Sequence, residues 1–229
     1  MRLSAFFALA LLLCACSRST EEVREVPAKA PSPAPPTAPA APDSRHVLAV
    51  FGDSIAAGFG VETGLGFPEF LQKKLDAEKY PWRVVNLGIS GDTTEGGVSR
   101  IDSAVSLKPE IVILELGGND GLRGLPPETT RKNLETMIVA FQKSGARVVL
   151  AGMTLPPNYG APYIQQFEKM YRDLAATYKL TLIPFLLQDL VTKDLRYMQS
   201  DGLHPTAAGH QIVADTVFRT VKPFLSAAR

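Results

Sequence analysis

The sequence predicts an α/β fold in which a central parallel β-sheet is covered by helices on both faces. From His46 onward, short apolar runs alternate with amphipathic stretches, which is the pattern of repeated strand–helix units. Most of the apolar runs are rich in Val, Ile and Leu without polar alternation, as expected for strands buried on both faces. Glycine-rich polar segments follow three of these runs, where loops at one edge of such a sheet would begin.

Each element is expected in turn along a single domain without internal repeats. The expected strands are Val47–Phe51, Arg83–Leu87, Ile111–Leu116, Arg147–Gly152 and Leu180–Ile183. The expected helices are Phe67–Glu78, Thr94–Leu107, Glu128–Ser144, Pro162–Tyr178 and Thr206–Leu225. Pro68 lies in the first turn of the first helix, a favoured position, whereas Pro109 and Gly145 end the second and third helices.

Composition excludes several classes of protein. The chain has 229 residues, 45% of them hydrophobic, which is enough to build a core and excludes a disordered chain. A formal net charge of +1 and a pI of about 7.8 argue against a nucleic-acid-binding protein. Two cysteines are too few for a disulfide scaffold, and both precede the expected domain.

The N-terminus has the features of a secretory signal. Arg2 precedes an 11-residue apolar run that ends at Ala15, too short for a membrane span of about 20 residues. A buried N-terminal helix is the alternative, and the proline-rich stretch that follows argues against it. Leu13-Cys14-Ala15-Cys16 resembles a bacterial lipobox, although Cys14 departs from the usual small residue there. The resemblance implies a signal peptide over residues 1–16 and lipidation of Cys16.

Residues 17–45 are expected to form a disordered tether. Of the 16 residues from Pro27 to Pro42, 13 are Pro or Ala, a composition that favours extended polyproline II and cannot form a core. At about 3.1 Å per residue this stretch spans roughly 50 Å. A lipid on Cys16 would anchor residues 46–229 to a membrane without spanning it. Ser17 after that cysteine suggests the outer membrane, so we expect a periplasmic, lipid-anchored protein of the bacterial envelope.

Three polar loops should converge on one edge of the sheet. Ligands of open α/β sheets bind beyond the carboxyl ends of the strands. Ser54 follows the first strand directly, at a strand-to-helix turn where free backbone N–H groups lie beside its hydroxyl. The three loops are Gly52-Asp53-Ser54, Gly88-Ile89-Ser90-Gly91-Asp92 and Gly117-Gly118-Asn119-Asp120.

A nucleophilic serine needs a base, and the base needs an orienting acceptor. Among the three histidines, His46 lies at the tether junction and His210 inside an expected helix, so structural roles are expected for both. His204 lies three residues after Asp201 in a tight turn, and could bond this carboxylate with one ring nitrogen while the other faces Ser54. Asp-Gly is also a common turn, so a purely structural role remains open. The chain lacks H-E-x-x-H, a phosphate-binding loop and G-x-S-x-G.

Taken together, these residues resemble the SGNH (GDSL) hydrolases. Four short blocks appear in the order of that family: Gly52-Asp53-Ser54, Gly88 with Ser90-Gly91-Asp92, Gly117-Gly118-Asn119-Asp120, and Asp201…His204-Pro205. Further stretches resemble the bacterial periplasmic thioesterase–lysophospholipase–arylesterase branch: Thr93-Thr94, Gly96-Gly97, 121–126 and 155–160. The resemblance implies a three-layer, flavodoxin-like sandwich with a five-stranded parallel sheet.

The resemblance also implies roles for the residues. Ser54 would be the nucleophile, His204 the general base and then acid, and Asp201 the partner of His204. The oxyanion hole would consist of the N–H groups of Ser54 and Gly88 and the side-chain amide of Asn119, and Asp53 would organise its loop. No cofactor and no metal would be required, because the protein's own donors stabilise the charge.

The expected substrates are acyl esters, acyl thioesters or lysophospholipids, and we expect a monomer. Five loop residues could line an acyl groove or simply cover the core: Leu122, Leu125, Pro126, Leu155 and Tyr159. The same four blocks could serve a carbohydrate O-acetyl esterase, which would have a small acetyl pocket instead of a groove. A non-catalytic binding module tethered to the cell surface is a third reading.

Overall fold

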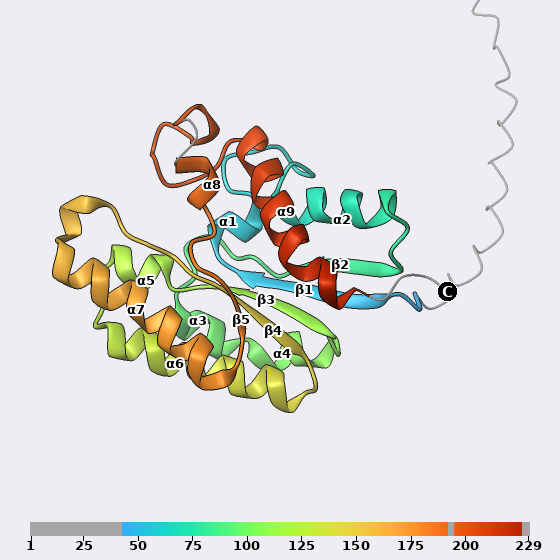
Figure 1. The fold of residues 1–229 in the computed structure, drawn as a ribbon, viewed down its shortest axis with the longest axis horizontal. Coiled ribbons are helices and arrows are strands. Elements are labelled where there is room, and N and C mark those ends of the chain that lie inside the picture. Colours follow the sequence, from blue (N-terminus) through green and yellow to red (C-terminus); the bar gives the residue numbers. More distant parts are fainter. Residues whose placement is uncertain (1–42, 192–194, 226–229) are drawn as a thin grey trace, which may run out of the picture. The chain divides into compact units, whose positions relative to one another are not determined.

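Five parallel strands form the central sheet, in the spatial order β2-β1-β3-β4-β5 (Figure 1). The computed structural model describes residues 43–191 and 195–225, and every neighbouring pair of strands in it is parallel. The strands are β1 (His46–Gly52), β2 (Trp82–Asn86), β3 (Ile111–Glu115), β4 (Arg147–Ala151) and β5 (Thr181–Ile183). The predicted α/β fold with a five-stranded parallel sheet is confirmed.

The strand order creates a switch point between β1 and β3. From β1 the chain moves to one edge of the sheet, and from β3 it moves towards the other. Ligands of a doubly wound sheet with this order bind at the carboxyl ends of the strands beside such a point. The register pairs Gly52 at the end of β1 with Glu115 at the end of β3. The segments that follow these two residues therefore begin side by side at the expected binding edge.

The strands are apolar because helices cover both faces of the sheet. Every residue of β3 is buried, as are the last five of β1. Figure 1 shows α2 and α9 on one face and α3, α4, α6 and α7 on the other. The helices are α1 (Ser54–Ala57), α2 (Phe67–Ala77), α3 (Thr94–Ser99), α4 (Ile101–Ser106), α5 (Gly118–Leu122), α6 (Pro127–Lys143), α7 (Ala161–Tyr178), α8 (Gln188–Val191) and α9 (Ala207–Val221). Three 3-10 turns are η1 (Pro157–Tyr159), η2 (Leu195–Tyr197) and η3 (Lys222–Phe224).

Two of the predicted helices differ from the observed ones, and three short helices were not predicted. The helix expected over 94–107 is broken at Arg100, whose backbone leaves the helical region with φ −116° and ψ 10°. The helix expected over 206–225 ends at Val221 and continues as a 3-10 turn to Phe224. The one-turn helices α1, α5 and α8 were not predicted, because a single turn has too few residues to show a helical period.

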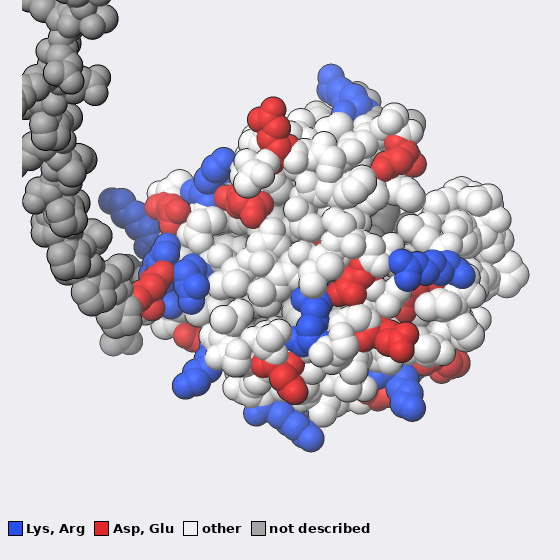
Figure 2. Space-filling view, turned by 180° about the vertical axis from the view of Figure 1, so that it is seen from behind, with Lys and Arg blue, Asp and Glu red and all other residues white. Residues whose placement is uncertain are grey.

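Several features of the N-terminal prediction lie outside the described residues: the signal peptide over 1–16, the lipidated Cys16 and most of the tether over 17–45. The described residues belong to one compact unit, Asp43–Arg229. Within that part of the chain, no helix combines the length and the hydropathy that a membrane span requires. Positive and negative side chains are interspersed over the face drawn in Figure 2, in keeping with the nearly balanced net charge.

Candidate active site

The turn between β1 and α1 presents Ser54 at the edge of the sheet. Asp53 caps the short helix, because its Oδ1 accepts the N–H of Ile55 at 3.2 Å. One turn later Gly58 adopts a φ of 71°, the left-handed conformation that ends the helix. Ser54 is the first helical residue, so its own N–H has no acceptor within the helix. The local sequence thus leaves a hydroxyl and a free N–H on the same residue.

The structure brings Ser54, His204 and Asp201 together, although 150 residues separate the serine from the histidine. Ser54 Oγ lies 2.8 Å from His204 Nε2, and His204 Nδ1 lies 2.7 Å from Asp201 Oδ2. The second oxygen of Asp201 accepts the N–H groups of Leu203 at 2.9 Å and His204 at 3.0 Å. This turn fixes the carboxylate against its own backbone, and the ring of Phe59, 4.6 Å away between centroids, packs against the imidazole.

The carboxyl group of Asp201 is held as an anion. Partial burial raises its pKa, but hydrogen bonds from the backbone and ring of His204 and from the N–H of Leu203 outweigh that effect and lower the pKa to about 2. An anion at this position accepts the Nδ1–H of the imidazole, which leaves Nε2 unprotonated and able to accept a proton from Ser54.

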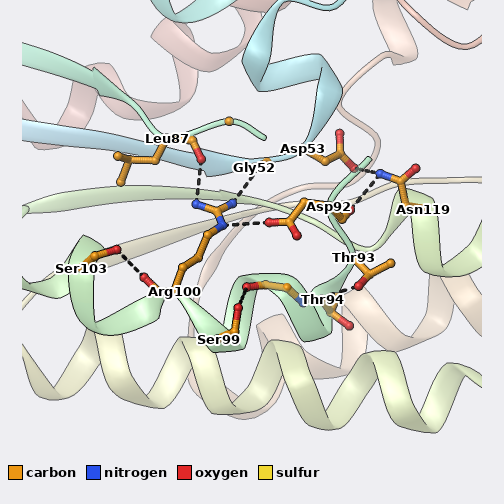
Figure 3. Close-up of polar contacts among 12 residues, drawn as sticks. Gly52, Asp53, Leu87, Asp92, Thr93, Thr94, Ser99, Arg100, Ser103 and Asn119 are labelled. Carbon is orange, nitrogen blue, oxygen red and sulfur yellow. Dashed lines mark hydrogen bonds and ion pairs between the residues drawn. The ribbon is translucent and has the colours of Figure 1, made fainter. Parts of the chain in front are cut away.

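Asn119, the second residue of α5, lies beside this turn. Its Nδ2 donates to Asp53 Oδ2 at 3.1 Å and to the backbone oxygen of Asp92 at 2.8 Å (Figure 3). Both partners are acceptors, so the orientation of the amide is fixed with its nitrogen towards Asp53. Gly117, at φ 113°, begins the turn, and a side chain there would meet the hydroxyl of Tyr171 at 2.3 Å. Gly117 is therefore required for Asn119 to occupy this place.

Arg100 joins the end of β1 to the segment that follows β2 (Figure 3). Its guanidinium donates to the backbone oxygens of Gly52 at 2.9 Å and Leu87 at 2.8 Å, and to the Asp92 carboxylate at 2.8 Å. The same group stacks 3.9 Å from the ring centroid of Phe51. The residue that makes these contacts is also the one at which the chain breaks between α3 and α4.

The structure differs from the prediction at Gly88. Its N–H donates to Asn86 Oδ1 at 2.9 Å, and the residue is not among those that line the cavity described below. A side chain at this position would meet the backbone nitrogen of Ala57 at 2.3 Å, so glycine is needed there for close packing against α1. In the same loop, the N–H groups of Ser90 and Gly91 have no hydrogen-bond partner among residues 43–191 and 195–225.

A cavity of about 500 Å³ opens at Ser54. Its polar end contains Ser54, Asn119 and His204, and most of its remaining wall is apolar. A cavity of this size and character accommodates a small apolar ligand group. The apolar side chains of the wall are Ile55, Leu122, Met153, Leu155, Pro156, Pro157, Phe185, Leu187, Val191, Met198 and Leu203.

Two of the five predicted groove residues, Leu122 and Leu155, line this cavity, whereas Leu125, Pro126 and Tyr159 do not. Tyr159 instead donates its hydroxyl to the backbone oxygen of Leu122 at 2.7 Å, and so supports the wall from behind.

Sequence reasoning missed the part of the wall formed by Phe185, Leu187, Val191 and Met198. Phe185 and Leu187 follow β5 and so lie at the same edge of the sheet as Ser54, a signal that the strand assignment already contained. Met198 had no such signal, because its position depends on how the segment before His204 packs.

His210 is structural, as expected from its place in a helix. It is fully buried in α9 and stacks on Phe67, and within the described residues neither ring nitrogen has a hydrogen-bond partner. Burial, together with the charge of His204, lowers the pKa of His210 to about 4 from an ordinary value of 6.5. The imidazole is therefore neutral at pH 7.

This histidine should weaken the fold in acid. Between pH 6.5 and pH 4 the unfolded chain binds a proton at His210 that the folded chain excludes, so the free energy of unfolding falls as the pH falls. Urea denaturation at pH 7 and pH 4 measures how much the free energy of unfolding falls between these pH values. The fall should be about 3 kcal/mol larger for the native protein than for His210→Gln. Because the other groups titrate alike in the two proteins, an equal fall in both would contradict a neutral, buried His210.

No group of three or more His, Cys, Asp or Glu side chains suited to a metal ion occurs in the part of the chain that the structure describes.

Comparison with known proteins places the chain among esterases. The model of the GDSL-like lipase/acylhydrolase family matches residues 50–212. Esterase TesA of Pseudomonas aeruginosa is 45% identical over 183 residues, which cover 80% of this chain and 90% of that protein. The arylesterase of Vibrio mimicus is 38% identical over 179 residues (78% and 89%). Thioesterase 1/protease 1/lysophospholipase L1 of Escherichia coli K12 is 33% identical over 184 residues (80% and 86%). A crystal structure of TesA superposes with a TM-score of 0.75 at 44% identity, covering 79% of this chain and all of that one.

Proposed function

The chain belongs to the GDSL-like lipase/acylhydrolase family and is an esterase/thioesterase of that family, and we propose that it cleaves acyl esters and thioesters through an acyl-enzyme on Ser54. The observation that supports the proposal is the chain of hydrogen bonds that runs from Ser54 Oγ through the ring of His204 to Asp201. These contacts lie at the polar end of an apolar cavity, where the carbonyl of an acyl group would meet the hydroxyl.

In the first step Ser54 Oγ attacks the carbonyl carbon of the substrate. As the new C–O bond forms, the hydroxyl proton passes to His204 Nε2, which lies 2.8 Å from Ser54 Oγ. The π electrons of the carbonyl group move to the carbonyl oxygen, which becomes the oxyanion. The Asp201 anion stabilises the imidazolium that results, because it accepts the proton on Nδ1. The imidazolium then gives its Nε2 proton to the leaving alcohol or thiol as the bond to the leaving group breaks.

In the second step water replaces the leaving group. His204 Nε2 takes a proton from the water, whose oxygen attacks the acyl carbon on Ser54. The second tetrahedral species collapses, the carboxylic acid leaves, and the proton on His204 returns to Ser54 Oγ. The cycle needs one water molecule and restores all three side chains.

The tetrahedral oxyanion needs fixed hydrogen-bond donors. We assign the N–H of Ser54 and the Nδ2 of Asn119, which line the cavity together. The loop before α3 would supply its free amides, those of Ser90 and Gly91, in place of Gly88, whose N–H is already bonded to Asn86. Both hydrogens of Asn119 Nδ2 already have acceptors. The oxyanion must therefore share the hydrogen of the longer hydrogen bond, which Asn119 donates to Asp53.

Replacing Asn119 by alanine should lower kcat by roughly 10²–10³, the usual loss for one oxyanion donor. The substrate's ground-state carbonyl gains less from this donor than the oxyanion does, so KM should change little. Steady-state kinetics on a p-nitrophenyl ester measures both constants, and circular dichroism establishes that the variant is folded. A kcat within tenfold of the native value would remove Asn119 from the hole.

The apolar wall of the cavity favours an acyl chain longer than acetyl. Each methylene that enters contributes about 0.8 kcal/mol, which is about fourfold in kcat/KM until the cavity is full. The value of kcat/KM should therefore rise to a maximum at medium chains. A series of p-nitrophenyl esters from acetyl to palmitoyl, followed by the matching acyl thioesters, measures this dependence. Activity confined to acetyl would indicate an O-acetyl esterase instead, and no hydrolysis of any chain would indicate a binding module.

We further propose that Cys16 is lipidated and holds the enzyme, as a monomer, in the periplasm at the outer membrane. The lipobox-like sequence and the proline-rich stretch after it support this proposal. Cell fractionation tests it: the native protein should be recovered with membranes, and a Cys16→Ser variant should not.

A further inference from the structure

Glu115 is a buried acid with no part in the reaction described above. It is the last residue of β3, and its side chain is completely buried. Gly52, its register partner on β1, makes room for the carboxyl group, since a side chain there would lie 2.3 Å from Glu115 Oε2. A buried charge without an ion-pair partner is costly, so this carboxyl needs a physical explanation.

The two oxygens of Glu115 have different surroundings. Oε2 accepts the N–H groups of Asp53 at 3.1 Å and Ala56 at 3.3 Å, both in the turn that carries Ser54. Oε1 is buried and receives no hydrogen bond from any donor in residues 43–191 and 195–225. The two carboxyl groups are close enough that the charge of Asp53 acts on Glu115. Two neighbouring carboxyl groups can hydrogen-bond to each other only if one of them holds a proton.

The distribution of donors shows which group holds that proton. The Asp53 carboxylate accepts hydrogen bonds from two donors, Ile55 N–H at 3.2 Å and Asn119 Nδ2 at 3.1 Å. Such surroundings stabilise an anion. Glu115 Oε1 has no donor near it, which suits an oxygen that itself carries the hydrogen.

We propose that Glu115 is a protonated positioning residue, which donates its O–H to the Asp53 anion and thereby holds Asn119 and the Ser54 turn in place for the proposed hydrolysis. Glu115 touches neither the substrate nor the nucleophile. It acts through Asp53, whose Oδ2 orients the Asn119 amide (Figure 3), and through the two N–H groups bound at its own Oε2. As a positioning role, the inference rests on the proposed function.

The proton of Glu115 also matters during the reaction. In the tetrahedral intermediate, the oxyanion would share the Nδ2 hydrogen that Asn119 donates to Asp53, so the Asp53 anion would lose part of that hydrogen bond. The O–H of Glu115 would still donate to Asp53, so the buried anion would keep a hydrogen-bond donor. The pair then carries one negative charge near His204, which becomes positive in the same step.

The electrostatics agree with this assignment. Burial, followed by the charge of Asp53, raises the pKa of Glu115 well above its ordinary value. Burial also raises the pKa of Asp53, to about 6, against the opposing effects of the Ile55 N–H, Glu115 and His204. Burial, followed by the charges of Asp120, Asp53 and Glu115, also raises the pKa of Tyr171 of α7.

A matched pair of variants separates the two possible locations of the proton. Glu115→Gln keeps the shape of the side chain, an oxygen for the two N–H groups and a hydrogen for Asp53, so kcat should fall less than about threefold. Asp53→Asn removes the anion that orients Asn119, and kcat should fall by about 10- to 100-fold, below the 10²–10³ of a deleted donor. The opposite result, a tolerant Asp53→Asn and a defective Glu115→Gln, would overturn the proposal.

A second measurement does not depend on activity. The folded protein keeps the Glu115 proton that the unfolded chain loses above its ordinary pKa of 4.5, so the native protein loses stability as the pH rises from there. Glu115→Gln has no such proton. Its urea midpoint should therefore increase relative to the native midpoint between pH 5 and pH 8. A constant difference would show that Glu115 is ionised and overturn the proposal, even if the esterase assignment stands.

A third variant covers the case in which the first two are ambiguous. Glu115→Leu fills the space but cannot bind Asp53 or the two N–H groups, so kcat should fall at least tenfold while KM for the ester changes little. If this variant is folded by circular dichroism and retains the native kcat, Glu115 has no positioning role.

Discussion

Ser54→Ala should lose ester and thioester hydrolysis almost completely, with kcat lower by a factor on the order of 10⁴–10⁶. In the proposed mechanism this hydroxyl forms the covalent bond to the acyl carbon, and no neighbouring side chain replaces it. The substitution removes one oxygen from a residue that is 9% exposed, so the fold should remain. The N–H of residue 54 and Asn119 also remain, so weak residual catalysis by the oxyanion hole is expected.

The control for this variant is Ser103→Ala. Ser103 is an exposed residue of α4 whose hydroxyl donates to the backbone oxygen of Arg100 at 2.7 Å. Its removal should leave kcat within about twofold, as for surface substitutions in general. If Ser54→Ala kept more than about 1% of the native kcat under the same conditions, a water molecule activated by His204 would have to be the nucleophile, and the acyl-enzyme mechanism would be wrong.

Asp201→Asn should lower kcat by about 10⁴ while the turn stays folded. The Asn side chain can still accept the N–H groups of Leu203 and His204 through its oxygen. Its NH₂ group, however, then faces His204 Nδ1 and favours the tautomer with the proton on Nε2. In that tautomer the imidazole cannot accept the proton of Ser54, and the positive charge that develops on the ring has lost its anionic partner.

Steady-state kinetics with a p-nitrophenyl ester, compared with the exposed Asp102→Asn on α4, isolates this effect. The control removes a carboxylate and changes the net charge equally, so a similar small loss in both variants would contradict a role for Asp201 in orienting the base. A loss confined to Asp201→Asn, with KM little changed, would support it.

The fold could be predicted from the sequence because its central strands, β1, β3 and β4, are buried on both faces. The run Ile111–Leu116, for example, is apolar except for Glu115, and β3 occupies all but its last residue. The break at Arg100 was not predicted. The guanidinium of this residue binds groups distant in the sequence, including the backbone oxygen of Gly52, and no short sequence pattern shows such contacts.

The candidate site was partly predictable for a related reason. Ser54 and Asn119 each follow a strand, and the carboxyl ends of parallel strands meet at one edge, so their proximity follows from the topology. The role expected for Gly88 did not follow, because the direction of an N–H in a glycine-rich loop depends on side chains such as Asn86. The wall around Met198 and the state of Glu115 likewise depend on packing that no short pattern shows.

The most direct test of the central claim, a covalent intermediate on Ser54, is to label the protein with a fluorophosphonate and locate the adduct by mass spectrometry. The account predicts one phosphonate per chain on Ser54, loss of hydrolysis in proportion to labelling, and no adduct in Ser54→Ala. Hydrolysis that continues while Ser54 is fully labelled, or an adduct on another serine that abolishes activity, would contradict it.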